Sequence, residues 1–395
     1  MNRPPVWLGG FSYSRQVSSR LRPFFWPLVV IAFAICAFAL LRYKRPELVD
    51  FAVPRTAAFR ALAAEPLYRP EDGHYQYKYL PAFALAMAPF TWPPKATAEF
   101  LWFGLMVAMA WAFVRLSLRA LPDRRSPESR LVWLTLLVTG KFFVKELAFG
   151  QFNLPLALLL MGAVIAAGRG RALVAGLLVA LGVFVKPYAL VLVPRLLVAA
   201  GWTPLLSFVA VTMAGLAVPS VVYGWQGNLA LLHDWYRTVT ETTAPNLMTF
   251  ENISFASMWA RWTHPGPLAS TLAAFTSAAA VATGLALVRK RGGIREPHYL
   301  EAAFFFVLIP LLSPQGWDYV LLLALPAYMC LVDRFAELGR GWRMIVLTGF
   351  VLTSFAIYDL LRRALYFHVM ELAGGSAGAI LIALSLVRLR SKRLA

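Results

Sequence analysis

The residues best suited to chemistry in this sequence are one carboxylate and two lysines close to apolar segments. Asp50 lies near the predicted start of a helix over Val53–Glu65, and a helix N-terminus favours an ionised carboxylate. Lys78 stands in the aromatic run Tyr75–Pro81, and Lys186 lies in a very short turn between two apolar runs. A carboxylate can remove a proton from a hydroxyl group, and lysines stabilise the charge on a departing phosphate. Together, these three residues indicate a reaction in which a sugar is transferred from a lipid phosphate.

Each of these residues also has a purely structural interpretation. Asp50 is consistent with a solvated acid beside the basic segment 42–45, and Glu47 is a rival for the role of base. Lys78 is consistent with a side chain that reaches lipid headgroups. A purely structural role is harder to assign to Lys186, because ionisable groups so close to the hydrocarbon of the membrane are costly in free energy and usually functional.

The composition excludes an ordinary soluble protein. The chain has 395 residues, of which 59% are hydrophobic and 14% charged, whereas a soluble domain has about 45–50% apolar and about 25% charged residues. Lys and Arg number 38 against 19 Asp and Glu, and they occur in short clusters between apolar runs. This distribution is typical of cytoplasmic loops of membrane proteins rather than of a nucleic-acid-binding surface. We therefore expect an all-α polytopic membrane protein.

Twelve apolar runs are candidate membrane spans, although several are shorter than the roughly 20 residues that a helix needs to cross the bilayer. They form one transmembrane domain over residues 1–395, without internal repeats. The predicted spans are Phe24–Leu41, Ala96–Leu118, Leu131–Leu147, Asn153–Ala167, Ala172–Val185, Pro187–Ala200, Pro204–Tyr223, Pro267–Val288, Pro297–Leu312, Trp317–Val332, Trp342–Tyr358 and Leu372–Val387.

The basic clusters also predict the orientation of the chain. They place both terminal tails, residues 1–23 and 388–395, in the cytoplasm. The two longest loops, residues 42–95 and 224–266, then lie on the opposite side, and long loops commonly carry function. Tyr79–Trp92 is short and bounded by prolines, so it is better suited to an interfacial helix than to a span. Juxtamembrane helices are therefore expected in the first outer loop.

Other charged residues have open interpretations. Lys141, Lys145 and Glu146 have the spacing of an intrahelical cluster, which either lines the site or only stabilises its helix. Asp318 is flanked by aromatic residues at a span end, where a cap, a structural salt bridge and a catalytic role are all possible. The five histidines lack metal-ligand spacing, and the sequence has no Asp-x-Asp pair. We expect metal-independent chemistry without a cofactor.

Short motifs follow one another in a definite order through most of the chain. They are Val49-Asp50-Phe51, Pro66-Leu67-Tyr68, Tyr77-Lys78-Tyr79-Leu80-Pro81, Pro89, Trp102, Gly150-Gln151-Phe152-Asn153, Val185-Lys186-Pro187, Asn252-Ile253-Ser254 and Ser313-Pro314-Gln315-Gly316-Trp317. The sequence resembles the GT-C membrane glycosyltransferases, and most closely glycosyltransferase family 87, which includes polyprenol-phosphate-mannose-dependent mannosyltransferases. Two positions depart from the family pattern: Leu80-Pro81 stands where a Pro-Pro pair is frequent, and Asp318 where a His is frequent.

The resemblance implies a GT-C fold and a role for individual residues. Asp50 matches the catalytic base, and Lys78 and Lys186 match lysines that contact the lipid phosphate. Gln151 and Asn153 match a polar pair that we expect to position the donor. The remaining substrate-binding candidates are Tyr77, Tyr79, Asn252 and Asp318.

The implied enzyme is an inverting glycosyltransferase in the bacterial inner membrane. It would move a sugar, mannose by analogy with the family, from a polyprenyl-monophosphate donor to a hydroxyl of a lipid or glycan acceptor on the non-cytoplasmic side. Its partners would be that donor, that acceptor and membrane lipids, with no nucleic acid. A transporter or lipid flippase is the alternative, but such proteins tend to have repeated halves and polar residues at the bilayer midplane.

Overall fold

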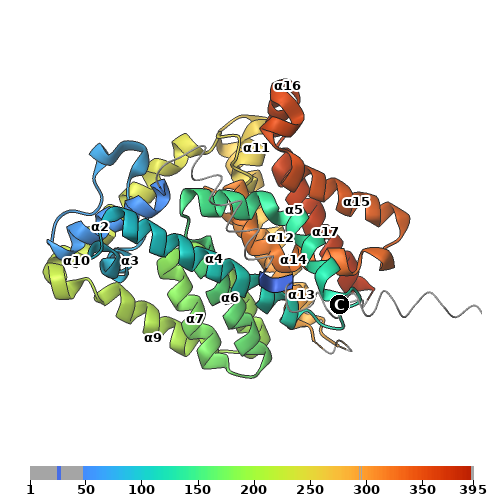
Figure 1. Ribbon diagram of the computed structural model, residues 1–395, viewed down its shortest axis with the longest axis horizontal. Helices are drawn as coiled ribbons and strands as arrows, with labels where there is room; N and C mark the ends of the chain where they lie inside the picture. The colour runs from blue at the N-terminus through green and yellow to red at the C-terminus, as the bar shows by residue number, and fades with distance from the viewer. Residues whose placement is uncertain (1–24, 28–47, 293, 295, 393–395) are drawn as a thin grey trace, which may run out of the picture.

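The computed structural model describes residues 25–27, 48–292, 294 and 296–392. The protein is helical, with 81% helix and no strand in this described part, and this confirms the expected all-α class (Figure 1). An isolated β-bridge joins Asn252 to Trp317. The predicted tail 1–23 and most of the predicted span Phe24–Leu41 lie outside the described residues.

The helical elements follow one another with short connections. In chain order they are α2 (Val49–Leu62), η1 (Pro70–Tyr75), α3 (Pro81–Ala86), η2 (Ala88–Thr91), α4 (Lys95–Ala120), α5 (Glu128–Phe149), α6 (Asn153–Gly168), α7 (Ala172–Val185), η3 (Pro187–Leu192), α8 (Val193–Ala200), α9 (Thr203–Ala217), α10 (Ser220–Asn246), α11 (Phe255–Thr263), α12 (Pro267–Arg289), α13 (His298–Leu312), η4 (Asp318–Ala324), α14 (Leu325–Asp333), η5 (Phe335–Glu337), α15 (Arg340–Phe350), η6 (Val351–Phe355), α16 (Tyr358–Glu371) and α17 (Gly374–Ser391).

The centre of the bundle is α13. Its residues from Tyr299 to Leu311 are all buried, and a helix that is apolar around its whole circumference must be covered on every side. It contacts α6, α12, α14 and α17, as well as η3 and η4. These neighbouring elements pack around α13. The turns at their ends carry the polar residues.

The predicted spans from Ala96 onward all fall on helices, but most are too short to cross a bilayer alone. By length and composition, α4 and α12 can each cross a membrane, and two bent helix pairs raise the count to four among the described residues. Within the predicted span Pro204–Tyr223 the chain bends by 95° between α9 and α10, so this segment is not one straight helix. The second bent pair joins Arg340–Phe355 to α16 at 105°.

The exposed surface of the bundle carries many large apolar side chains. Leu206, Val209 and Met213 on α9 are 68%, 53% and 61% exposed, and Trp202 and Trp225 near the helix ends are also exposed. Apolar patches of this kind are typical of surfaces that contact lipid. The apolar helices and this surface agree with a membrane protein.

Both segments that were expected to be outer loops contain helices. Residues 48–95 hold α2, η1, α3 and η2, and Asp50 lies in the first turn of α2. Most of residues 224–266 belong to α10 and α11 rather than to an irregular loop. In Figure 1, α2, α3 and α10 lie together at one end of the molecule, away from α15 and α17.

Candidate active site

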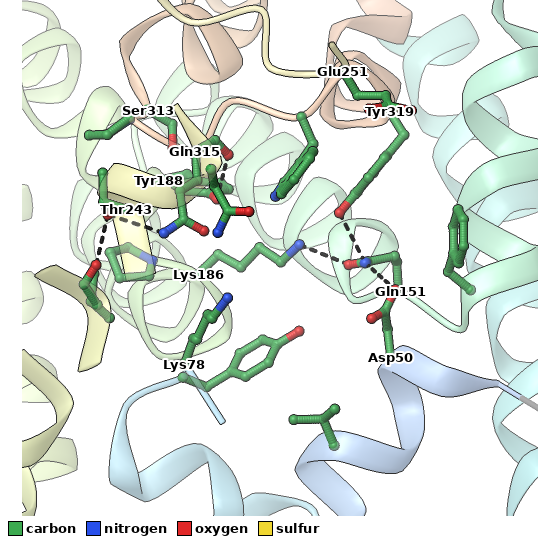
Figure 2. Close-up of a pocket in the computed structure, with 18 of the residues that line it drawn as sticks. Asp50, Lys78, Gln151, Lys186, Tyr188, Thr243, Glu251, Ser313, Gln315 and Tyr319 are labelled. Carbon is green, nitrogen blue, oxygen red and sulfur yellow. Dashed lines mark hydrogen bonds between the residues drawn. The ribbon is translucent and has the colours of Figure 1, made fainter. Parts of the chain in front are cut away.

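One cavity of about 820 Å³ brings together side chains from both outer segments and from the turns of the bundle. Asp50, Lys78, Gln151 and Lys186 all line it, and Figure 2 shows them converging on the same space. They come from α2, from the segment before α3, and from the turns before α6 and after α7. Residues far apart in sequence therefore meet in the way that group-transfer chemistry requires.

The Gly150 turn places Asp50 beside Gln151. Gly150 ends α5 in the left-handed conformation with φ of 73°, which glycine adopts without steric cost. A Cβ on Gly150 would lie 2.9 Å from the Cβ of Leu48 and 3.0 Å from that of Phe51. Because the start of α2 packs this closely on the turn, Gln151 Nε2 reaches Asp50 Oδ2 at 2.6 Å.

The ammonium group of Lys186 lies between two amide side chains. The extended conformation of Lys186 ends α7, as expected for a residue that precedes a proline. Its Nζ donates to Gln151 Oε1 at 3.1 Å and to Asn153 Oδ1 at 2.8 Å. An ammonium has three N–H groups, so these two bonds leave capacity for an anion in the cavity.

The charge state of this lysine is set by opposing effects. Burial lowers the pKa of Lys186, while the negative charges of Glu146 and Asp50 act to raise it. The net shift is downward, so the ammonium is poorly solvated by its surroundings. An anionic ligand would stabilise its charged form.

Glu146 determines the orientation of the Asn153 amide. Its carboxylate is fully buried and accepts from Asn153 N and Asn153 Nδ2, both at 2.7 Å, and from Leu154 N at 3.0 Å. These donors lie at the N-terminus of α6, where negative charge is favoured. Because the amide nitrogen of Asn153 faces Glu146, its oxygen faces Lys186.

The predicted cluster of Lys141, Lys145 and Glu146 is therefore not a unit. The two lysines point away from Glu146 and pair with Asp318, with Nζ–carboxylate distances of 2.8 Å in both cases. Lys145 also lines the cavity. The i,i+4 spacing shows which residues are neighbours on one helix. It does not show that Lys145 pairs with Asp318, which is 173 residues away in the sequence.

The aromatic segment before α3 divides between the cavity and the core. Lys78 and Tyr79 line the cavity, and burial lowers the pKa of Lys78 against the opposing effect of Asp50. Tyr77 is only 1% exposed, and its hydroxyl donates to the carbonyl of Leu80 at 3.0 Å. Tyr77 thus supports the segment from behind and is not among the residues that line the cavity.

Three further predicted substrate-binding residues also lie behind the cavity surface. Asn153 and Asp318 hold lysines, as described above, and neither is among the lining residues. Asn252 donates its Nδ2 to the carbonyls of Asn246 and Pro314 at 3.0 and 2.9 Å. All three are buried and have partners within the protein, so in this structure they act as supports.

Sequence reasoning missed several residues that line the cavity. Tyr319 accepts a 3.1 Å hydrogen bond from Gln151 Nε2, and its position next to Asp318 in the late motif could have indicated this. One face of α10 also contributes, although that segment was interpreted as a loop. The helical spacing of its lining residues was the available signal: Trp235, Val239, Thr243 and Asn246.

The site combines a carboxylate with ammonium groups in one cavity. Among the described residues, no group of three or more His, Cys, Asp or Glu side chains is arranged to hold a metal ion. A helical membrane protein with a carboxylate beside two ammonium groups in one cavity fits the class of membrane transferases.

Comparison with known families identifies that class more closely. The sequence matches glycosyltransferase family 87 over residues 77–314, which is more than half of the chain. The protein therefore belongs to this family and is a glycosyltransferase. No curated protein and no solved structure was found to match it. Lys78, Gln151 and Lys186 fall within the matched region, whereas Asp50 precedes it.

Proposed function

We propose that this protein is an inverting glycosyltransferase that uses a polyprenyl-monophosphate sugar, with mannose as the sugar. The observation that carries the proposal is the arrangement around Gln151, whose amide bonds the Asp50 carboxylate on one side and the Lys186 ammonium on the other. A base and a phosphate-binding cation are thereby held in one cavity. The family match supports the reaction type.

In the proposed reaction, Asp50 takes the proton from a hydroxyl of a lipid or glycan acceptor. The acceptor oxygen attacks the anomeric carbon, and the bond between that carbon and the phosphate oxygen breaks. Polyprenyl phosphate leaves with the bonding electrons, so the configuration at the anomeric carbon is inverted. Lys186 and Lys78 stabilise the leaving phosphate, and the reaction requires no metal ion.

We further propose a GT-C-like arrangement in the bacterial inner membrane, with twelve spans and the cavity on the non-cytoplasmic side. The support is the clustering of basic residues in the predicted cytoplasmic loops. The exposed apolar helices provide the surface that the prenyl chain and membrane lipids would contact.

The test is sugar transfer by the purified full-length protein. Radiolabelled polyprenyl-phosphate mannose would be supplied with a membrane lipid extract as the acceptor pool, with and without a chelator. We expect transfer by the wild type in both conditions and no transfer by Asp50→Asn, although this variant should still bind the donor. Glu65→Gln, an exposed carboxylate that pairs with Arg69, is the matched control and should transfer normally.

Each part of the proposal can fail separately. Transfer by Asp50→Asn at the wild-type rate would exclude this residue as the base. Loss of transfer with chelator would contradict the metal-independent mechanism. If the wild type neither binds nor consumes the labelled donor, the polyprenyl-phosphate mannose assignment is wrong.

A further inference from the structure

The cavity has a second wall whose chemistry differs from that of the Asp50–Lys186 side. Thr243 and Asn246 at the end of α10, Glu251, Gln315 and Trp317 all line it, and we refer to these five residues as the second wall. In Figure 2, Thr243 and Gln315 lie on the opposite side of Lys186 from Asp50 and Gln151. Both walls therefore face one space, in which two substrates can meet.

We propose that the second wall is the acceptor site, and that it binds a ring with adjacent hydroxyl groups, with Glu251 as its main specificity-determining residue. This inference rests on the proposed function. It adds to that function the residues that select the acceptor and the chemical class of the group they recognise.

The wall is rigid because two separate chain segments are joined along it. Ile253 N donates to Gly316 O and Asp318 N donates to Glu251 O, both at 2.8 Å. The bridge between Asn252 and Trp317 lies between these bonds. The backbone of Glu251 is thus fixed next to the turn that carries Gln315 and Trp317.

The side chain of Gln315 is also held in place. Its Nε2 donates to Thr243 Oγ1 at 3.1 Å, and the backbone carbonyl oxygen of the same residue accepts from the Tyr188 hydroxyl at 3.3 Å. Two aromatic rings follow in the same segment, and those of Trp317 and Tyr319 are stacked with an interplanar angle of 5° and a centroid distance of 6.4 Å. A pre-ordered wall can bind a ligand without a large ordering cost.

The chemistry of the wall suits hydroxyl groups rather than phosphate. Thr243, Asn246 and Gln315 are neutral, and Glu251 carries the one charge among the five residues, a negative one. A carboxylate has two oxygens that accept hydrogen bonds, so it can bind two neighbouring hydroxyls at once, whereas it repels a phosphate. Lys78 and Lys186 are not part of this wall, and Lys145, which also lines the cavity, is already paired with Asp318.

The test uses two soluble acceptor probes of different chemistry, octyl mannopyranoside and octanol, with polyprenyl-phosphate mannose as donor. We expect the wild type to prefer octyl mannopyranoside over octanol. In Glu251→Gln, the KM for octyl mannopyranoside should rise about tenfold or more, because a charged hydrogen bond is lost, while the donor Kd changes less than twofold. Gln315→Ala should give a smaller rise in the same acceptor KM.

Glu241→Gln is the matched control, because Glu241 is an exposed residue of α10 that pairs with Arg237. It should leave both the acceptor KM and the donor Kd unchanged. Equal use of octanol and octyl mannopyranoside by the wild type, or an unchanged acceptor KM in both Glu251→Gln and Gln315→Ala, would overturn the inference. Failure of the wild type to bind the donor would instead overturn the proposed function.

Discussion

Gln151 and Lys186 share a 3.1 Å hydrogen bond in which the amide oxygen faces the ammonium group. This orientation is determined by the other end of the amide, because its nitrogen donates to Asp50 at 2.6 Å. One neutral side chain thus bridges the carboxylate of Asp50 and the ammonium group of Lys186.

The first prediction concerns this amide. Gln151→Ala removes the donor to Asp50 and the acceptor for Lys186, so the carboxylate and the ammonium group lose their common support. We expect sugar transfer, measured as kcat/KM, to fall about 100-fold, which is the scale on which misplaced catalytic groups act. Gln226→Ala, at an exposed position of α10, should have no effect. Near-normal transfer by Gln151→Ala would show that the amide does not organise the site.

A second prediction concerns the close contact between the Gly150 turn and α2. Gly150→Ala should reduce activity strongly, because the new methyl group would be within 3.0 Å of Leu48 and Phe51 and would displace Asp50. Gly170→Ala provides the control, since Gly170 has nearly the same φ of 72° but no atom within 4 Å of its Cβ position. Both variants should lose about 1 kcal/mol of unfolding free energy from backbone strain.

The measurement is a comparison of thermal unfolding and sugar transfer in the two variants. We expect only Gly150→Ala to lose activity beyond what its stability explains. Equal activities in the two variants would mean that the packing of α2 on the Gly150 turn does not position Asp50.

The sequence predicted well those parts of the site that depend on local features. Asp50 was expected near a helix start and lies in the first turn of α2. Lys186 was expected in a very short turn, because two apolar runs flank it with almost no loop between them. Residues at neighbouring ends of a bundle converge once the apolar runs form helices, so Lys78 and Gln151 share the cavity with these two residues.

The parts that sequence could not predict depend on side-chain partners far away in the chain. The sequence spacing predicted that Glu146 forms a cluster with Lys141 and Lys145. In the structure, both lysines instead form ion pairs with Asp318, and Glu146 accepts hydrogen bonds from the first residues of α6. Asn252 was likewise expected to bind substrate, whereas its amide joins two loops. A polar residue in a motif does not show whether it faces a ligand or the protein.

The third prediction is that Glu146 acts as a positioning residue. Glu146→Gln places an amide where the carboxylate accepts three hydrogen bonds, so the orientation of Asn153 toward Lys186 is no longer enforced. We expect the KM for the donor to rise about tenfold, the scale of a lost hydrogen bond to a charged group, with a smaller change in kcat. Glu146→Asp should recover part of the donor affinity.

Glu128→Gln is the control for that variant, because Glu128 lies at the other end of the same helix and pairs with Arg115. It should leave the donor KM unchanged. If Glu146→Gln instead lowers kcat and thermal stability with an unchanged donor KM, Glu146 has only a structural role.

The last prediction is a loss of donor affinity at alkaline pH. Burial lowers the pKa values of Lys78 and Lys186, so both ammonium groups lose their proton at a lower pH than an ordinary lysine. The phosphodiester of the donor keeps its single negative charge through this range, so its attraction to the site should weaken as pH rises.

Lys186→Arg should move the decline in donor affinity to higher pH, because an arginine stays protonated. Lys290→Gln, at an exposed position, should reproduce the wild-type curve of donor Kd against pH. A donor Kd that stays constant up to the range where ordinary lysines titrate would show that neither lysine binds the phosphate through its charge.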